Sequence, residues 1–137
     1  MKTETIPMQK QDNKKILAVL DDLFFTVKIT EAAKRVGLEV ELARNEIDAL
    51  EKARRMPLLI ILDLNTNALQ PLKLAVRLKG DAALKSISVI GYLSHVQGEL
   101  KQKAHEAGLD MVLARSAFSQ NLPQILNIRK SAKEEQP

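Results

Sequence analysis

The stretch Pro57–Asn65, with the sequence PLLIILDLN, decides the fold. Five apolar residues, Leu58 to Leu62, run without alternation into a single carboxylate at Asp63. An unbroken apolar run of this length is typical of a strand buried on both faces, and such strands belong to parallel sheets covered by helices. In open parallel sheets, ligands and reactive groups gather at the carboxyl ends of the strands. Asp63 is therefore the first candidate for a functional residue.

Short apolar runs alternate with helical patterns along the rest of the chain. The helical patterns have apolar residues at steps of three and four, Gly37 follows the first of them, and Asn45 is placed to cap the second. Such alternation requires right-handed crossovers and a parallel sheet with helices on both faces. We expect strands at 15–20, 38–43, 58–63, 87–93 and 110–114, and helices over 23–36, 45–56, 71–80, 94–108 and around 122–128.

Composition narrows the class of protein. With 137 residues, 28% of them charged and 45% hydrophobic, the chain has the size and balance of one globular domain. No apolar run reaches the roughly 20 residues of a membrane span, and the polar start lacks a signal-peptide core. The absence of Cys rules out disulfides and thiolate metal sites. We expect a cytoplasmic protein that binds neither membranes nor nucleic acid, because one Tyr and no Trp provide no stacking platform.

Polar residues follow four of the expected strands in a characteristic order. Asp21 and Asp22 follow the first, Asp63 the third, Ser94 the fourth and Arg115 the fifth. This ordered set resembles a response-regulator receiver domain of the CheY type over residues 15–128. The stretches 63–65, 78–90 and 107–110 also resemble segments of that family. The resemblance implies an α/β fold, a flavodoxin-like doubly wound five-stranded parallel sheet with strand order 2-1-3-4-5. From the residues themselves we expect a single domain over 15–130, with a flexible arm at 1–14 and a tail at 131–137.

The resemblance also implies a chemistry. Asp63 would be the phospho-acceptor, and Mg²⁺ would be held by Asp21, Asp22, Asp63 and the backbone carbonyl of Asn65. Ser94 and Arg115 would contact the phosphate. The output would pass through the face formed by the fourth helix, fifth strand and fifth helix to a protein partner such as a histidine kinase, or to a second copy in a homodimer. The chain itself is not expected to be an enzyme.

Several positions depart from the family pattern. Counting without gaps places Leu20 and Asp21 on the two acidic positions of the first strand, whereas a slip of one residue restores Asp21 and Asp22. Arg115-Ser116 stands where the family has Lys-Pro, and Val112 stands where it has an aromatic residue. Either Leu93 or Ser94 occupies the hydroxyl position.

These residues also have structural interpretations. Asp21 and Asp22 suit an N-cap and a first-turn acid of the first helix, and Ser94 suits the cap of the fourth helix. Arg115 suits an ion pair with Asp63.

Two functions follow, and both place the chain in signalling. The first is a stand-alone receiver in a two-component phosphorelay with Asp63 as its phospho-acceptor. The second is a degenerate pseudo-receiver, a protein-interaction module that works without phosphorylation. A flavodoxin-like nucleotide binder is a distant third, because the loop after the first strand, Asp21–Phe25, is acidic and bulky where phosphate would bind.

Overall fold

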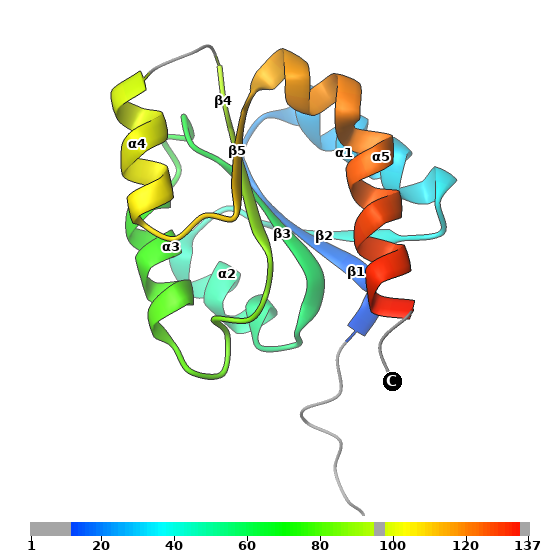
Figure 1. Ribbon diagram of the computed structural model, residues 1–137, viewed down its shortest axis with the longest axis horizontal. Coiled ribbons are helices and arrows are strands. Elements are labelled where there is room, and N and C mark those ends of the chain that lie inside the picture. The colour runs from blue at the N-terminus through cyan, green and yellow to red at the C-terminus, as the bar shows by residue number, and fades with distance from the viewer. Residues whose placement is uncertain (1–11, 95–97, 135–137) are drawn as a thin grey trace, which may run out of the picture.

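One five-stranded sheet forms the centre of the protein (Figure 1). The computed structural model describes residues 12–94 and 98–134. The strands lie in the order β2-β1-β3-β4-β5, and all neighbouring pairs are parallel. This confirms the predicted strand order and fold class. The strands are β1 (Asp12–Val19), β2 (Glu39–Ala43), β3 (Pro57–Asp63), β4 (Val89–Leu93) and β5 (Met111–Ala114).

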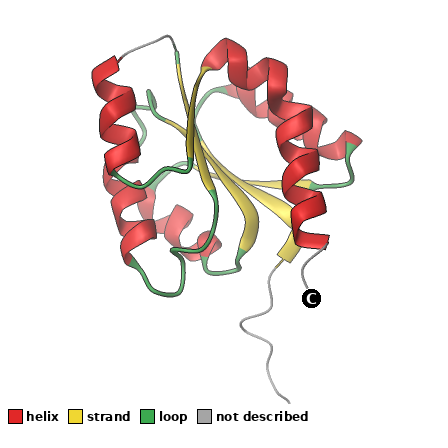
Figure 2. Cartoon of the chain, viewed as in Figure 1, coloured by secondary structure: helices red, strands yellow, loops and turns green. Residues whose placement is uncertain are grey.

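Helices cover both faces of the sheet (Figures 1 and 2). Successive side chains of a strand point to opposite faces, so Leu17 and Ile60 pack in one core and Ile16 and Ile61 in the other. The first core is closed by α2, α3 and α4, and the second by α1 and α5. The helices are α1 (Leu23–Arg35), α2 (Glu46–Ala53), α3 (Pro71–Gly80), α4 (Gly98–Glu106) and α5 (Arg115–Glu134).

The local signals in the sequence act as predicted at several helix ends. Helix α1 is followed by Gly37, whose φ of 78° is the left-handed conformation that favours glycine. The Asn45 side chain caps α2 by accepting a hydrogen bond of 2.8 Å from the Asp48 amide. Pro71 is the first residue of α3, where its missing N–H costs nothing.

Other boundaries differ from the predictions. Strand β1 begins at Asp12 rather than Lys15, and α5 begins at Arg115 itself and continues to Glu134. In α2 the side chain of Ile47 is 73% exposed, and Ala49 and Ala53 are the residues that pack inward. The helix expected over 94–108 is observed as α4 from Gly98 to Glu106, and residues 95–97, which follow the expected cap at Ser94, lie outside the described residues.

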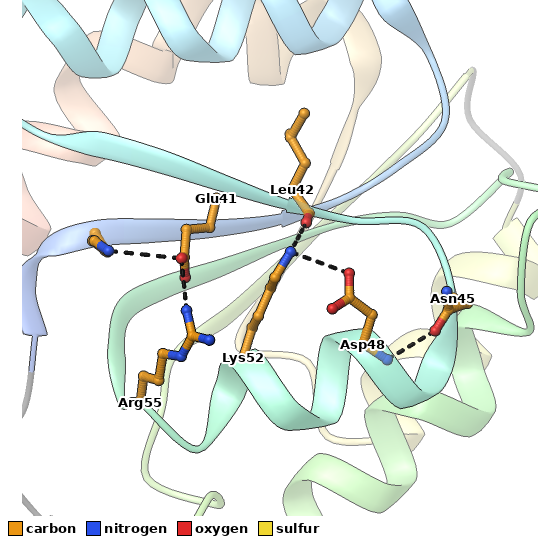
Figure 3. A network of polar contacts seen from close by, with 7 residues as sticks. Glu41, Leu42, Asn45, Asp48, Lys52 and Arg55 are labelled. Atoms are coloured by element: carbon orange, nitrogen blue, oxygen red, sulfur yellow. Dashed lines mark hydrogen bonds and ion pairs between the residues drawn. The ribbon is translucent and has the colours of Figure 1, made fainter.

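Polar contacts cover the free edge of the sheet at β2 (Figure 3). Lys52 of α2 donates a hydrogen bond of 2.6 Å to the carbonyl of Leu42, and its ammonium lies 3.1 Å from Asp48. Glu41 of the same strand pairs with Arg55 at 2.8 Å. An edge strand with open carbonyls invites pairing with other chains, and charged side chains placed along it oppose such pairing. This network therefore opposes the pairing of the β2 edge with a strand of another chain.

None of the helices in the described ranges is both long enough and apolar enough to span a membrane.

Candidate functional site

Strand β3 carries Asp63 to the carboxyl rim of the sheet. The strand is fully buried from Pro57 to Leu62, and Asp63 at its end is half-buried. The backbone N–H of Asn65 donates to Asp63 Oδ1 at 2.9 Å. The side-chain oxygen of Asn65 in turn accepts from the Ser94 amide at 2.6 Å. These two bonds fix the loop after β3 to the end of β4.

The surroundings of Asp63 disfavour its charged form. Burial raises the pKa of Asp63 above its usual range, and the neighbouring charge of Asp22 raises it further. The Asn65 amide and the charge of Arg115 lower it, but they do not cancel the effect of burial. Among the described residues, Oδ2 of Asp63 has no hydrogen-bond donor. Asp63 is thus a partly desolvated carboxyl group with one oxygen available.

The two acids predicted after β1 take separate directions. Asp21 is exposed, and its carboxylate lies 3.6 Å from Arg44. Asp22 is the N-cap of α1, and its Oδ1 accepts from the Phe25 amide at 3.1 Å. The expected N-cap is thus present at Asp22, whereas α1 has no acidic residue in its first turn, so the expectation of a first-turn acid is wrong. Leu20, just before them, is 2% exposed and belongs to the core beneath α1 and α5.

Arg115 is paired with Asp22. The ion pair joins the Arg115 guanidinium to Asp22 Oδ2, so the structural partner expected at Asp63 is Asp22 instead. The guanidinium carbon also lies 4.5 Å from the centre of the Phe25 ring, a cation–π contact. The charge of Arg115 still reaches Asp63, since it lowers the pKa of that carboxyl. Three predicted residues, Asp22, Asp63 and Arg115, therefore share one electrostatic neighbourhood.

An aromatic cluster beneath this rim has no counterpart in the sequence-based predictions. We define it as Phe25 of α1, Tyr92 of β4 and Phe118 of α5. The Tyr92 ring lies 4.8 Å from Phe25 and 5.0 Å from Phe118, measured between ring centres. Tyr92 is the register partner of Asp63. The sequence contains only four aromatic residues, and three of them meet here, one each from α1, β4 and α5. Their positions in the sequence give no sign of this contact.

The hydroxyl of Tyr92 is a buried polar group without a hydrogen-bond partner among the described residues. Burial raises the pKa of Tyr92, and the nearby charge of Asp63 raises it further. The charges of Asp22 and Arg115 also act on it, in opposite directions. The aromatic cluster thus lies within electrostatic reach of the whole rim.

The structure places the residues at the family's hydroxyl position after β4 and at its aromatic position on β5. Leu93 is 2% exposed and packs in the core, whereas Ser94 is exposed at the rim. Val112 of β5 is buried in the core closed by α2, α3 and α4, so no aromatic ring stands at that place on β5. Three of the four aromatic rings, those of Phe25, Tyr92 and Phe118, lie on the opposite face, under α1 and α5.

The acid donors do not fit a divalent cation. Mg²⁺ prefers several oxygen ligands in near-octahedral geometry. Within residues 12–94 and 98–134, no group of three or more His, Asp or Glu side chains converges as a metal site would require. Asp21 faces Arg44, and the charge of Asp22 is neutralised by Arg115. The predicted set of Asp21, Asp22 and Asp63 is therefore not assembled as a metal centre.

Comparisons with solved structures point to one family. The chain is similar to the phosphorylated cyanobacterial phytochrome response regulator RcpA, with 27% identity, a TM-score of 0.69 and coverage of 88% of this chain and 91% of the other. It is also similar to the receiver domain of a histidine kinase from Syntrophus aciditrophicus, with 22% identity, a TM-score of 0.77 and coverage of 90% and 95%.

A third similar structure contains a metal. It is the Mn²⁺-bound form of the response regulator Rcp1, with 20% identity, a TM-score of 0.67 and coverage of 89% and 93%. No protein-family model matches the sequence, and no curated protein matches it either. The low identity agrees with the departures at Leu20, Val112 and Arg115. The chain has the fold of a CheY-like response-regulator receiver domain, in an atypical form.

Proposed function

We propose that the chain is a receiver-like signalling domain that acts by binding protein partners. In this proposal an ion pair, and not a metal, neutralises the acidic side chain of Asp22 at the carboxyl rim of the sheet. The observation that carries this proposal is the Arg115 guanidinium, which is paired with Asp22 and stacked over Phe25. In this arrangement one acid near Asp63 is already neutralised by a side chain. Fold similarity to response regulators supports the signalling role. We place the protein in the cytoplasm and assign it no enzymatic activity of its own.

A second candidate is the phosphorelay role with Asp63 as phospho-acceptor. It is favoured by the position of Asp63 at the end of β3, half-buried, with one oxygen held by Asn65. A bound Mg²⁺ would offset charge on an incoming phosphoryl group. Because the carboxylates present do not fit that ion, we derive no phosphoryl-transfer step for this chain.

Incubation with acetyl phosphate and Mg²⁺, followed by intact-mass measurement, separates the two candidates. A receiver domain of known activity is the positive control, and Asp63→Asn is the matched negative control. Our proposal predicts that the protein gains no phosphoryl group under conditions that label the positive control. A mass gain in the natural chain that is lost in the Asp63→Asn variant would establish the phospho-acceptor role instead.

Partner binding provides the complementary test. Once a partner is found by co-elution, its affinity for the natural chain and for Asp63→Ala should agree within a factor of two to three. A large loss of affinity in a variant that remains folded by circular dichroism would contradict a phosphorylation-independent module.

A further inference from the structure

A cavity of about 180 Å³ lies between α1 and α5, which pack side by side on one face of the sheet (Figure 1). We call it the α1–α5 cavity. It is lined from α1 by Lys28, Glu31, Ala32 and Arg35, and from α5 by Ser119, Leu122 and Pro123. On each helix these residues follow steps of three and four, so they form one stripe along it. The cavity begins beyond the first turn of α1, away from the rim that carries Asp63.

The lining of the α1–α5 cavity is apolar in part, and it includes an interruption of the helix backbone. Leu122 is buried and Ala32 is half-buried. Pro123 lies inside α5 and has no backbone N–H, so the carbonyl of Ser119, four residues earlier, lacks its α-helical donor. The cavity therefore combines apolar surface with backbone whose helical hydrogen bonding is incomplete.

Charge is distributed unevenly between the two helical layers. Among the described side chains, α1 and α5 carry six Lys and Arg and one acid: Lys28, Lys34, Arg35, Arg115, Arg129, Lys130 and Glu31. The layer formed by α2, α3 and α4 is nearly balanced, with six Lys and Arg and five Asp and Glu. Complementary charge selects partners and speeds their encounter, so the α1–α5 face favours an anionic partner.

The two cations at the cavity are not committed to strong contacts within the protein. The Lys28 ammonium lies 5.7 Å from the centre of the exposed Phe24 ring, a weak cation–π contact. Within the described residues, the side chains of Arg35 and Glu31 make no hydrogen bond or ion pair. Glu31 lies between the two cations on the stripe, but its single charge leaves the stripe positive.

The size of the cavity and the spacing of its cations indicate what kind of ligand fits. Small-molecule sites usually measure about 300–1,000 Å³, so about 180 Å³ suits a single side chain of a partner better than a cofactor. Lys28 and Arg35 are seven residues apart, which is about 10 Å along a helix. Two acids seven residues apart on another helix have the same separation and share one face, with room for an apolar residue between them.

We propose that the α1–α5 cavity is the docking site for an acidic amphipathic helix of a partner protein. Two acidic side chains of that helix pair with Lys28 and Arg35, and an apolar side chain between them enters the cavity beside Ala32 and Leu122. Docking of a helix into a groove through anchors at such spacings is a common mode of recognition. The inference rests on the proposed function for its role in signalling, and it places the partner between α5 and α1, not between α5 and α4.

Titration of the full ¹⁵N-labelled chain with a synthetic peptide tests the docking site. The probe is an alanine-based helical peptide with two glutamates seven residues apart and a leucine four residues after the first of them. The control peptide has glutamines in place of the glutamates. We expect the glutamate peptide to cause saturable shifts at amides of residues 28–35 and 119–124. The control peptide should bind about fivefold more weakly, the factor expected for losing two exposed ion pairs.

Variants make the result specific. Lys28→Gln and Arg35→Gln should each weaken binding of the glutamate peptide about two- to fivefold, because each removes one ion pair. Lys73→Gln is the matched control, since Lys73 is an exposed cation of α3 in the opposite layer, and it should bind as the natural chain does. Absence of saturable shifts, shifts centred on other elements, or equal affinity in all three variants would overturn the proposal.

Vesicles containing phosphatidylserine and duplex DNA serve as competing anions. Neither should displace the glutamate peptide from the natural chain at matched ionic strength, and displacement by either would mean that the face binds anions without regard to the helix. Labelling by acetyl phosphate tests the proposed function and does not involve the cavity. Failure of the proposed function and failure of the docking site are therefore distinguishable.

Discussion

Asp22 performs two structural tasks, and two substitutions separate their energies. Asp22→Ala removes both the N-cap and the ion pair with Arg115. Loss of an N-cap costs about 1 kcal/mol, with a range of about 0.5–2. A pair whose side chains are 28% and 36% exposed adds about 0.2–1 kcal/mol after screening by solvent. We therefore expect Asp22→Ala to lower the free energy of unfolding by about 0.7–3 kcal/mol, the sum of the two contributions.

Asp22→Asn keeps the capping oxygen, because Asn caps helices about as well as Asp. It should therefore cost at most about 1 kcal/mol, the contribution of the ion pair alone. Urea unfolding monitored by circular dichroism measures both values. Asn45→Ala is a matched control, since it removes the exposed cap of α2 with no ion pair attached and should cost about 1 kcal/mol. If Asp22→Asn proves as costly as Asp22→Ala, the cap contributes nothing and the reasoning is refuted.

Three further predictions follow from the site, the core and the sheet edge. Asp63→Asn should raise stability at neutral pH and leave it unchanged near about pH 3, below the usual Asp pKa. Burial raises the pKa of Asp63, so the folded protein loses stability as the pH rises from the usual Asp pKa through the raised one. An equal effect of the substitution on the free energy of unfolding at both pH values would contradict this sign. Gly91→Ala should cost about 1–3 kcal/mol, because the added Cβ would lie 2.4 Å from a methyl group of Leu109. Gly80→Ala, with open space around it, should cost nothing, and equal losses in urea unfolding would argue against the tight packing. Lys52→Met should lower the free energy of unfolding by about 1 kcal/mol, because it removes the hydrogen bond to the Leu42 carbonyl that Figure 3 shows. An unchanged free energy of unfolding would mean that this hydrogen bond does not stabilise the fold.

Most of the fold could be predicted because each element carries its own local signal. The apolar run before Asp63 predicts a central strand that is covered on both faces. The helix ends are marked by residues with strong local preferences, namely Gly37, Asn45 and Pro71. The spacing of Ile47 fits the helical pattern, yet its side chain is exposed, because Ala49 and Ala53 form the inner face of α2. Local patterns therefore locate elements better than they assign faces.

The candidate site was predictable only in part. Asp63 stands out because a charge ends an apolar run, and Asp21 and Asp22 stand out as two acids directly before a helical pattern. The pairing of Asp22 with Arg115 joins residues 93 positions apart, and no local pattern encodes such a contact. The aromatic cluster has the same character, since Phe25, Tyr92 and Phe118 meet only after three elements have packed together.

The central claim is that the Arg115 guanidinium neutralises Asp22 at the place where the family resemblance leads us to expect a divalent cation. Titration with Mn²⁺, followed by paramagnetic broadening of amide signals in a ¹H–¹⁵N spectrum of the full chain, tests it most directly. We predict that the amides of Asp22, Asp63 and Asn65 broaden no earlier than those of exposed acids elsewhere, such as Glu51. Selective early broadening of these three rim amides, reversed by excess Mg²⁺, would contradict the account.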